Sequence, residues 1–452
     1  MAFDPARVDA FRRIHRGAVL TAGEPGYEEG RRVWNAIIDK RPAVIARCRT
    51  AVDVIAAVKF ARTNGLPVAI RGGAHNVAGR ATCDGGIVID CAEMKSIRVD
   101  PAARTARAEP GVRWAELDRE TQAFGLATTG GTVGDTGIGG LTLGGGFGWL
   151  GGALGMTADN LIAADVVLAT GELVHANAES NSDLLWALRG GGSNFGVVTS
   201  FEYRLHPIGP MIVGGLVMHP FDRAAEVLRF YGDFIRTAPD CLTVAAVLLT
   251  GPDGQKACGL AAACVGPVDE GEKAVLPIKQ FGPPVLDMLG PIPYLGQQAL
   301  LERAMPPNLL NYWKADFIKD MSDGVIQTAI EAYARVPSPL SSILFFPIHG
   351  AASRIAPDAA AYPHRAGIHM GLYSLWNDAG QNEPNVTWAR QLWKAIQPFA
   401  TGGVYVNELG EDDGDERVRQ AYGANYERLT RIKAKFDPQN VFHLNANIVP
   451  RA

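Results

Sequence analysis

The sequence predicts an α+β protein of two domains, and three observations support this. The chain has 452 residues, more than one compact core usually holds. Short apolar strands alternate with a capped helix over the first ninety residues, which is typical of an α/β layer. After His206-Pro207, longer amphipathic helices alternate with apolar segments typical of antiparallel strands. We therefore expect a first domain over residues 1–207, with its core at about 38–207, and a second over residues 208–400.

The first ninety residues predict one short helix, then strand, helix, strand, turn and strand. The opening "MAFDPARVDAFRRIHRGAVL" has no apolar core or small-residue cleavage site, so it predicts an amphipathic helix and no secretory signal. Thr50 is a good N-cap and Gly65 a good stop for the helix between them. Strands are expected at 42–48, 67–71 and 85–91.

Glycine is concentrated between residues 130 and 155, where it makes up half of the sequence. Apolar residues such as Phe147 and Trp149 are interleaved, so this glycine field is not a flexible linker. Glycines mixed with apolar residues indicate a backbone pressed against something large and flat.

The next elements are a hairpin, a helix and a strand. "LIAADVVLATGELVHA" (161–176) predicts a hairpin that turns at Thr170-Gly171, and a helix, a glycine turn and a strand at 197–205 follow. In the last fifty residues we expect a helix from Arg417 to Lys435, within a segment 401–452 that returns to the first domain.

The composition excludes several classes of protein. The net charge is −4 and there is no Lys/Arg run, so we expect no nucleic-acid partner. No apolar stretch reaches the length of a membrane span, so we expect no membrane contact. The six cysteines form no CxxC pair and no Cys/His cluster, which predicts free thiols in the cytoplasm and no metal site.

Two glycine segments could hold a cofactor. "GFGWLG" (146–151) fits a dinucleotide fingerprint, but no apolar strand precedes it, so we reject a Rossmann fold and an NAD dehydrogenase. Consecutive backbone N–H groups in tight turns instead form an anion-binding concavity that could hold a pyrophosphate without any Lys or Arg. "RGGAHNVAG" (71–79) and the glycine field both suit this geometry.

These two segments, together with "LLWALRGGGSNFGVVTSFEYRLHP" and the C-terminal "YVN…YGANYERLTRIKAKFDPQNVFHLNANI", resemble the FAD-linked oxidases of the berberine-bridge-enzyme type. That family lies within the vanillyl-alcohol-oxidase superfamily, and the sequence is most similar to its bacterial 6-hydroxynicotine oxidase branch. The resemblance covers nearly the whole chain. It implies a two-part PCMH-type FAD-binding domain and an α+β substrate domain, whose antiparallel sheet is covered by helices.

The resemblance also implies how FAD is held. The family's turn histidine bonds the flavin covalently, and here that residue is His75, with Ala74 at a usual glycine position. The family's second link uses a cysteine, which Val133 replaces, so one link is expected. Thr136 lies near the position that governs oxygen access in the family. The expected cofactor-binding residues are Arg71, Gly72, Gly73, Ala74, His75, Asn76, Gly79, Thr132, Val133, Gly134, Gly137, Gly139, Gly140, Gly145, Asp159, Asn160, Val197, Tyr405 and Asn407.

The catalytic base is open among several residues. Tyr405 belongs to the family's Tyr-x-Asn signature, where it contacts flavin or substrate or is a structural phenol. Glu408 is either an acid–base group or an exposed carboxylate, and the following "GEDDGDE" is expected to be a solvated loop. His349, Tyr312 and Lys314 are further candidates. The lysine either attracts an acidic or phenolate substrate or is solvated.

The resulting hypothesis is an enzyme that oxidises a small, alkaloid-like amine or alcohol by hydride transfer to flavin N5, with O2 as final acceptor giving H2O2. The alternatives are a carbohydrate or alcohol oxidase or dehydrogenase of the same family, and a non-redox flavin- or metabolite-binding protein. We expect a monomer or a homodimer.

Overall fold

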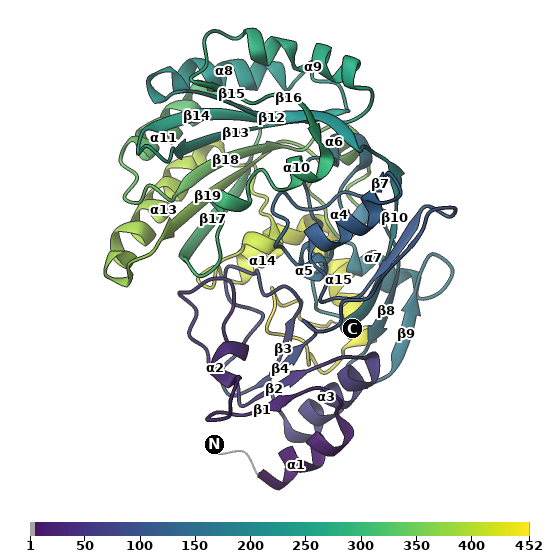
Figure 1. The fold of residues 1–452 in the computed structure, drawn as a ribbon. Coiled ribbons are helices and arrows are strands. Elements are labelled where there is room, and N and C mark those ends of the chain that lie inside the picture. The colour runs from purple at the N-terminus through teal and green to yellow at the C-terminus, as the bar shows by residue number, and fades with distance from the viewer. Residues whose placement is uncertain (1–4, 452) are drawn as a thin grey trace.

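Two small sheets and one large sheet form the frame of the molecule (Figure 1), which confirms the α+β class. The computed structural model describes residues 5–451, so residues 1–4 and 452 of the expected domains lie outside the described part. The two small sheets occupy the lower half of Figure 1, and the large sheet occupies the upper half with its long helices on the outside.

The first small sheet carries the turn with His75. Its order is β1-β2-β4-β3, and β2, β4 and β3 run parallel. Thr50 and Asp53 form a capping box at the start of α3, and Gly65 ends that helix with φ 61°, as predicted. The elements of this part are α1 (Pro5–Ile14), β1 (Val19–Leu20), α2 (Tyr27–Gly30), β2 (Val44–Arg47), α3 (Ala51–Asn64), β3 (Val68–Arg71) and β4 (Ile87–Asp90).

The second small sheet is antiparallel, in the order β5-β6-β10-β8-β9, and the predicted hairpin 161–176 forms its β8–β9 edge. The glycine field folds as loops and two short helices, α5 and α6, with no strand before "GFGWLG". The elements here are β5 (Ile97–Asp100), β6 (Thr105–Ala108), α4 (Trp114–Gln122), β7 (Leu126–Ala127), α5 (Ile138–Leu143), α6 (Gly151–Leu154), β8 (Leu161–Val167), β9 (Leu173–Ala176), α7 (Ser182–Leu188), β10 (Val197–Arg204) and β11 (His206–Pro207).

The large sheet is antiparallel throughout, in the order β15-β12-β14-β13-β18-β19-β17, with β16 also paired to β12. Helices α8, α9, α11 and α13 share one core with one face of it, so the other face is free to form a cavity wall. The elements are β12 (Met211–Pro220), α8 (Ala224–Phe234), β13 (Leu242–Thr250), β14 (Lys256–Cys264), α9 (Val268–Gln280), β15 (Leu286–Asp287), β16 (Gly290–Pro293), α10 (Tyr294–Gln298), β17 (Leu310–Ile318), α11 (Asp323–Ala334), β18 (Ser342–Pro347), α12 (Ala351–Arg354), β19 (Ile368–Trp376) and α13 (Asn382–Ile396).

The C-terminal segment packs into the core beside the second small sheet, through residues that include Val404, Tyr422 and Leu429. The single helix expected from Arg417 to Lys435 is wrong. The structure has two helices, α14 (Asp415–Tyr422) and α15 (Tyr426–Phe436), because Gly423 adopts φ 49° and interrupts the helical backbone.

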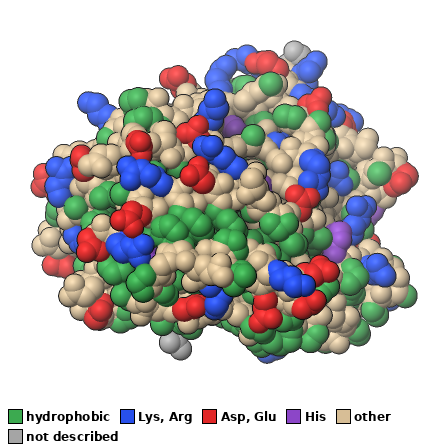
Figure 2. All heavy atoms as spheres, turned by 90° about the horizontal axis from the view of Figure 1, so that it is seen from above, with side chains coloured by type: hydrophobic (Ala, Val, Ile, Leu, Met, Phe, Trp, Pro, Cys, Tyr) green, Lys and Arg blue, Asp and Glu red, His purple; other side chains and the backbone are tan. Residues whose placement is uncertain are grey.

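The surface shows apolar and charged side chains intermixed. Figure 2 views the end of the molecule above the large sheet, where a band of apolar side chains is surrounded by charges of both signs. Within residues 5–451, none of the helices has the length and apolar character needed to cross a bilayer. In that same range all six cysteines are free thiols, and no cluster of three metal-binding side chains forms.

Candidate active site

A cavity of about 830 Å³ lies between the glycine segments and the free face of the large sheet. One side is backbone-rich, formed by residues 70–76 and by residues 131–133, 136–137 and 139–141. The other side is apolar, formed by sheet side chains that include Leu216, Val247, Leu344 and Trp313. Of the predicted cofactor-binding residues, those that line the cavity are Arg71, Gly72, Gly73, Ala74, His75, Asn76, Thr132, Val133, Gly137, Gly139, Gly140, Tyr405 and Asn407.

Two glycines explain why the loops can form this wall. A Cβ atom on Gly73 would lie 2.5 Å from the backbone nitrogen of Gly137, and one on Gly137 would lie 2.5 Å from that of Gly73. The loops therefore touch backbone to backbone, and any side chain at either position would force them apart. The resulting surface of exposed peptide groups suits a large planar ligand with an anionic group.

Six predicted cofactor residues do not line the cavity, and each is in contact with other parts of the protein. A Cβ on Gly79, Gly134 or Gly145 would meet other side chains of the protein. Asp159 forms a two-point ion pair with Arg365 at 2.7 and 2.9 Å. The Asn160 amide donates to two backbone carbonyls, and Val197 is fully buried in a core. Sequence spacing alone could not separate these residues from those that line the cavity.

His75 is held as a neutral imidazole with one free nitrogen. Its ring stacks on Trp34, with centroids 4.2 Å apart and planes 23° apart. Burial, with a smaller effect from the Arg113 charge, lowers the pKa of His75 to about 4. Its buried Nε2 atom has no hydrogen-bond partner among the described residues. A buried polar atom is rarely left unpaired, so this nitrogen fits a bond to a group in the cavity.

Glu408 is buried in the cavity wall, so of its two alternatives the exposed carboxylate is wrong. Its Oε2 atom lies 3.0 Å from Nε2 of His369, and its Oε1 atom accepts a hydrogen bond of 3.0 Å from the Tyr373 hydroxyl. Burial, followed by the Glu408 charge, raises the pKa of Tyr373 well above its usual value, so the phenol stays a donor. The group is a carboxylate held at both oxygens.

Sequence reasoning missed His369 and Tyr373, although a signal exists. Both lie on β19, four residues apart, and therefore share a face of the strand. Gly371 lies between them, and a Cβ there would be 2.4 Å from the Tyr373 ring. The glycine thus provides the space in which the tyrosine reaches back to Glu408.

Tyr405 also lines the cavity. Its oxygen accepts a 2.8 Å hydrogen bond from the Asn407 amide, which leaves the phenolic proton free to be donated. Burial raises the pKa of Tyr405, so the side chain is protonated at neutral pH. Its ring packs 4.8 Å from that of Phe147, another cavity residue.

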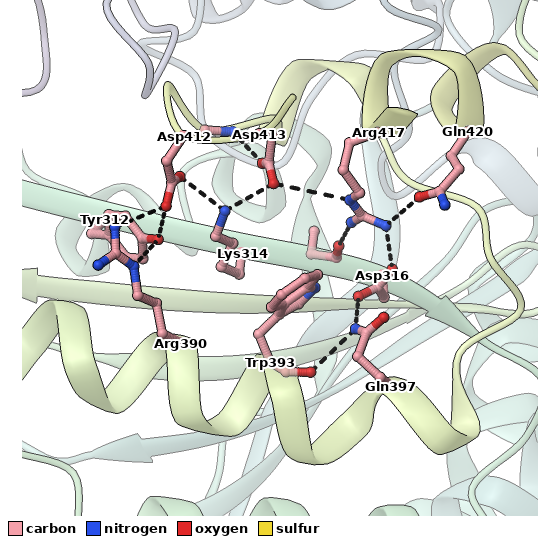
Figure 3. A network of polar contacts seen from close by, with 12 residues as sticks. Tyr312, Lys314, Asp316, Arg390, Trp393, Gln397, Asp412, Asp413, Arg417 and Gln420 are labelled. Atoms are coloured by element: carbon pink, nitrogen blue, oxygen red, sulfur yellow. Dashed lines mark hydrogen bonds and ion pairs between the residues drawn. The ribbon is translucent and has the colours of Figure 1, made fainter. Parts of the chain in front are cut away.

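Tyr312 and Lys314 of β17 lie beside Asp412 and Asp413 (Figure 3) and do not line the cavity, whereas Trp313 between them does. Lys314 is 4 % exposed and donates to Asp412 and Asp413, each at 2.9 Å, so it is neither solvated nor free to attract a substrate. The Tyr312 hydroxyl donates to Asp412 at 2.6 Å. A direct role in the site, expected from the sequence, has no geometric support.

The acidic run after Glu408 is not simply a solvated loop. Asp413 is 6 % exposed, bonds Lys314 and accepts from the backbone nitrogen of Gly410. Burial opposes ionisation of Asp412, yet its bonds from Tyr312 and Lys314 lower its pKa to about 2. Asp412 and Asp413 are structural anions that fix the loop to β17.

His349 lies outside the cavity. Its Nε2 atom is 3.4 Å from the Thr243 hydroxyl, and the ring packs against Gly152 of α6. Burial lowers the pKa of His349, which favours a neutral, structural side chain.

Comparisons with known proteins agree with this geometry. The family model described as "FAD binding domain" matches residues 42–177, and the model described as "Berberine and berberine like" matches residues 404–449. An FAD-linked oxidoreductase of Dictyostelium discoideum is 32 % identical, over 98 % of this chain and 97 % of its own. The (R)-6-hydroxynicotine oxidase of Paenarthrobacter nicotinovorans is 30 % identical, over 96 % of this chain and 97 % of its own.

Solved structures share the fold over nearly the whole chain. The crystal structure of 6-hydroxy-D-nicotine oxidase from Arthrobacter nicotinovorans has a TM-score of 0.89 at 27 % identity, covering 97 % of this chain and 98 % of that one. A chitooligosaccharide oxidase has a TM-score of 0.86 at 23 % identity, covering 99 % and 100 %, which shows the common fold alone.

Proposed function

This chain belongs to the FAD-linked oxidoreductases of the berberine-bridge-enzyme type, and from that premise we propose that it oxidises a small, alkaloid-like amine or alcohol, with Glu408 as the base. The single observation that carries the proposal is the buried Glu408 carboxylate in the cavity wall, bonded at both oxygens. When bound, FAD would supply the two-electron acceptor for oxidation of a C–H bond next to nitrogen or oxygen.

The residues of the chain handle the proton of the substrate. In this proposal Glu408 acts as a carboxylate that accepts a hydrogen bond from the Tyr373 hydroxyl and lies 3.0 Å from Nε2 of His369, and these two contacts orient it. It can take the proton from the amine or hydroxyl of a substrate in the cavity. Tyr405 stays protonated and can donate a hydrogen bond to the substrate heteroatom, which would orient the reacting C–H bond.

The apolar sheet wall supports a compact, largely apolar substrate. Leu216, Val247 and Leu344 offer no hydrogen bonds to a polyhydroxylated sugar, which disfavours the carbohydrate-oxidase alternative. We propose a single covalent link from FAD to His75, supported by its unpaired Nε2 atom and neutral ring. Val133, which lines the cavity, has no sulfur with which to form a second link.

Three measurements test the proposal. Flavin absorbance should remain with the wild-type chain after acid precipitation and should be released from His75→Ala. An anaerobic bleaching screen with amines, alcohols and sugars should give flavin reduction by an amine or alcohol, and air should then restore the colour with release of H2O2. Glu408→Gln should slow the reduction about 10²–10⁴-fold while the flavin content is unchanged. Full-rate reduction in that variant would remove Glu408 as the base.

The compartment and the assembly state remain predictions of this proposal. We place the protein in the cytoplasm, supported by its free thiols, as a monomer or homodimer. Fractionation and sedimentation of the native protein check both.

A further inference from the structure

Arg80 is a cation in the wall of the cavity whose side chain has no partner among residues 5–451. It ends the turn that carries His75, and its backbone nitrogen donates to the Asn76 side chain at 3.2 Å. Within the described part of the chain, its guanidinium makes no hydrogen bond or ion pair. Burial lowers the pKa of Arg80, and smaller electrostatic effects of Tyr422, Asp413 and Glu411 oppose this.

Other cations in or near the candidate site differ from Arg80 because each already has hydrogen-bond or ion-pair partners in the protein. Arg71, which also lines the cavity, donates to the backbone carbonyls of Gly30 and Arg32. Lys314 is bonded to two aspartates, and Arg417 to Asp316 at 3.0 Å. Arg80 is therefore, among residues 5–451, the cavity cation whose donors remain available.

The charges of the cavity indicate what Arg80 pairs with. Among the described residues three charged side chains line it, those of Arg71, Arg80 and Glu408, and Glu408 is bonded to His369 and Tyr373 of the large sheet. FAD brings two permanent negative charges, both on its diphosphate. Arg80 belongs to the glycine-rich side of the cavity, where peptide N–H groups provide only partial positive charge.

We infer that Arg80 forms a charge-assisted ion pair with the diphosphate of FAD, which makes it a cofactor-binding residue additional to the glycine loops. A planar guanidinium with five donors matches phosphate oxygens in geometry as well as in charge. This rests on FAD as the cofactor and not on the covalent link or on the identity of the substrate.

The test measures binding of two flavins to apoprotein of the full-length His75→Ala chain. Arg80→Met should weaken FAD binding about tenfold or more, because it removes a hydrogen-bonded charge. It should leave the affinity for riboflavin, which lacks the diphosphate, unchanged. Arg80→Lys should restore part of the FAD affinity, and Arg98→Met, at an exposed position on β5, should change neither affinity.

Two outcomes would overturn the inference. Equal weakening of FAD and riboflavin would assign Arg80 to the isoalloxazine, and unchanged FAD affinity would leave it without a cofactor contact. If the apoprotein does not fold, ³¹P NMR of the holoenzyme replaces the titration. The diphosphate resonances should shift in Arg80→Met but not in Arg98→Met, and identical spectra would contradict the pairing. A wild-type protein that releases FAD on acid precipitation would refute the covalent link while leaving this test intact.

Discussion

Asp118 is a buried carboxyl group whose replacement by asparagine should stabilise the protein at alkaline pH. It lies on α4, is 1 % exposed, and accepts a 2.8 Å hydrogen bond from the Gln298 amide and a weaker one, at 3.5 Å, from the Tyr294 hydroxyl of α10. Burial without a cation raises its pKa from 3.8 to about 7. The native state therefore holds a proton that the unfolded chain releases above pH ~4.

The size of the effect follows from the two pKa values. Because the carboxyl pKa is raised in the native state, the unfolding free energy is unaffected below the pKa of the unfolded chain. It falls as the pH rises toward and through about 7, the pKa of the native state. The difference between 3.8 and about 7 corresponds to about 4 kcal/mol of unfolding free energy once both states are ionised. The amide introduced by Asp118→Asn is neutral at every pH, and it can accept from Gln298 and donate to Tyr294 without this loss.

The assay is urea unfolding of Asp118→Asn and wild type, followed by circular dichroism at pH 4.5 and 8.5. The unfolding free energy of the variant minus that of wild type should increase by about 3 kcal/mol between these pH values. Asp358→Asn, at an exposed position, is the matched control and should show no such change. A gap that is the same at both pH values would refute the assignment of a raised pKa to Asp118.

Three further substitutions test the packing around the site, each by its unfolding free energy or flavin content. Lys314→Met should cost about 3 kcal/mol because it removes the buried cation that bonds both Asp412 and Asp413, whereas Arg390→Met, at an arginine that is 56 % exposed, should cost less than about 1 kcal/mol; equal losses would contradict a buried clamp. Ala74→Gly should raise stability by about 0.5–1 kcal/mol, because Ala74 has φ 57°, and a loss would show that this backbone is not strained. Gly73→Ala places a methyl group 2.5 Å from the backbone of the facing loop, so its flavin-to-protein absorbance ratio should collapse. Gly140→Ala, whose new methyl group meets no described atom within 4 Å beyond its chain neighbours and its own helix backbone, should fold normally, and unaltered flavin content in Gly73→Ala would show that the loops can separate.

Local features of the sequence predicted local structure well. The cap at Thr50 and the stop at Gly65 bound α3, because both depend on backbone groups within a few residues. The His75 turn was found because small residues flanked it and because the family resemblance was specific. Gly423, in contrast, interrupts a pattern that is otherwise helical, since one left-handed residue can outweigh the periodicity around it.

Contacts between distant segments could not be predicted in the same way. Glu408 meets His369 and Tyr373 across 39 and 35 residues, and only the fold brings those segments together. The face on which Lys314 lies depends on the register of β17, and a shift of one residue exchanges it with Trp313. A lysine and a tryptophan next to each other on a strand are therefore both plausible site residues until the structure separates them.

The segment that carries Glu408 is fixed to both faces of the large sheet, and this accounts for how a base on an irregular loop can be positioned. On the cavity face, Glu408 bonds two side chains of β19. On the opposite face, Asp413 bonds Lys314, and Arg417 bonds Asp316 and donates to the carbonyl of Ala315 at 2.9 Å (Figure 3). Because β17 is the edge strand beside β19, the segment passes around that edge and is held before and after the turn. Because the loop is held at both ends, it cannot pivot. If the bonds of Lys314 to Asp412 and Asp413 are lost, one end is released and the Glu408 carboxylate can move. Lys314, although outside the cavity, should therefore influence the rate of substrate oxidation through the position of Glu408.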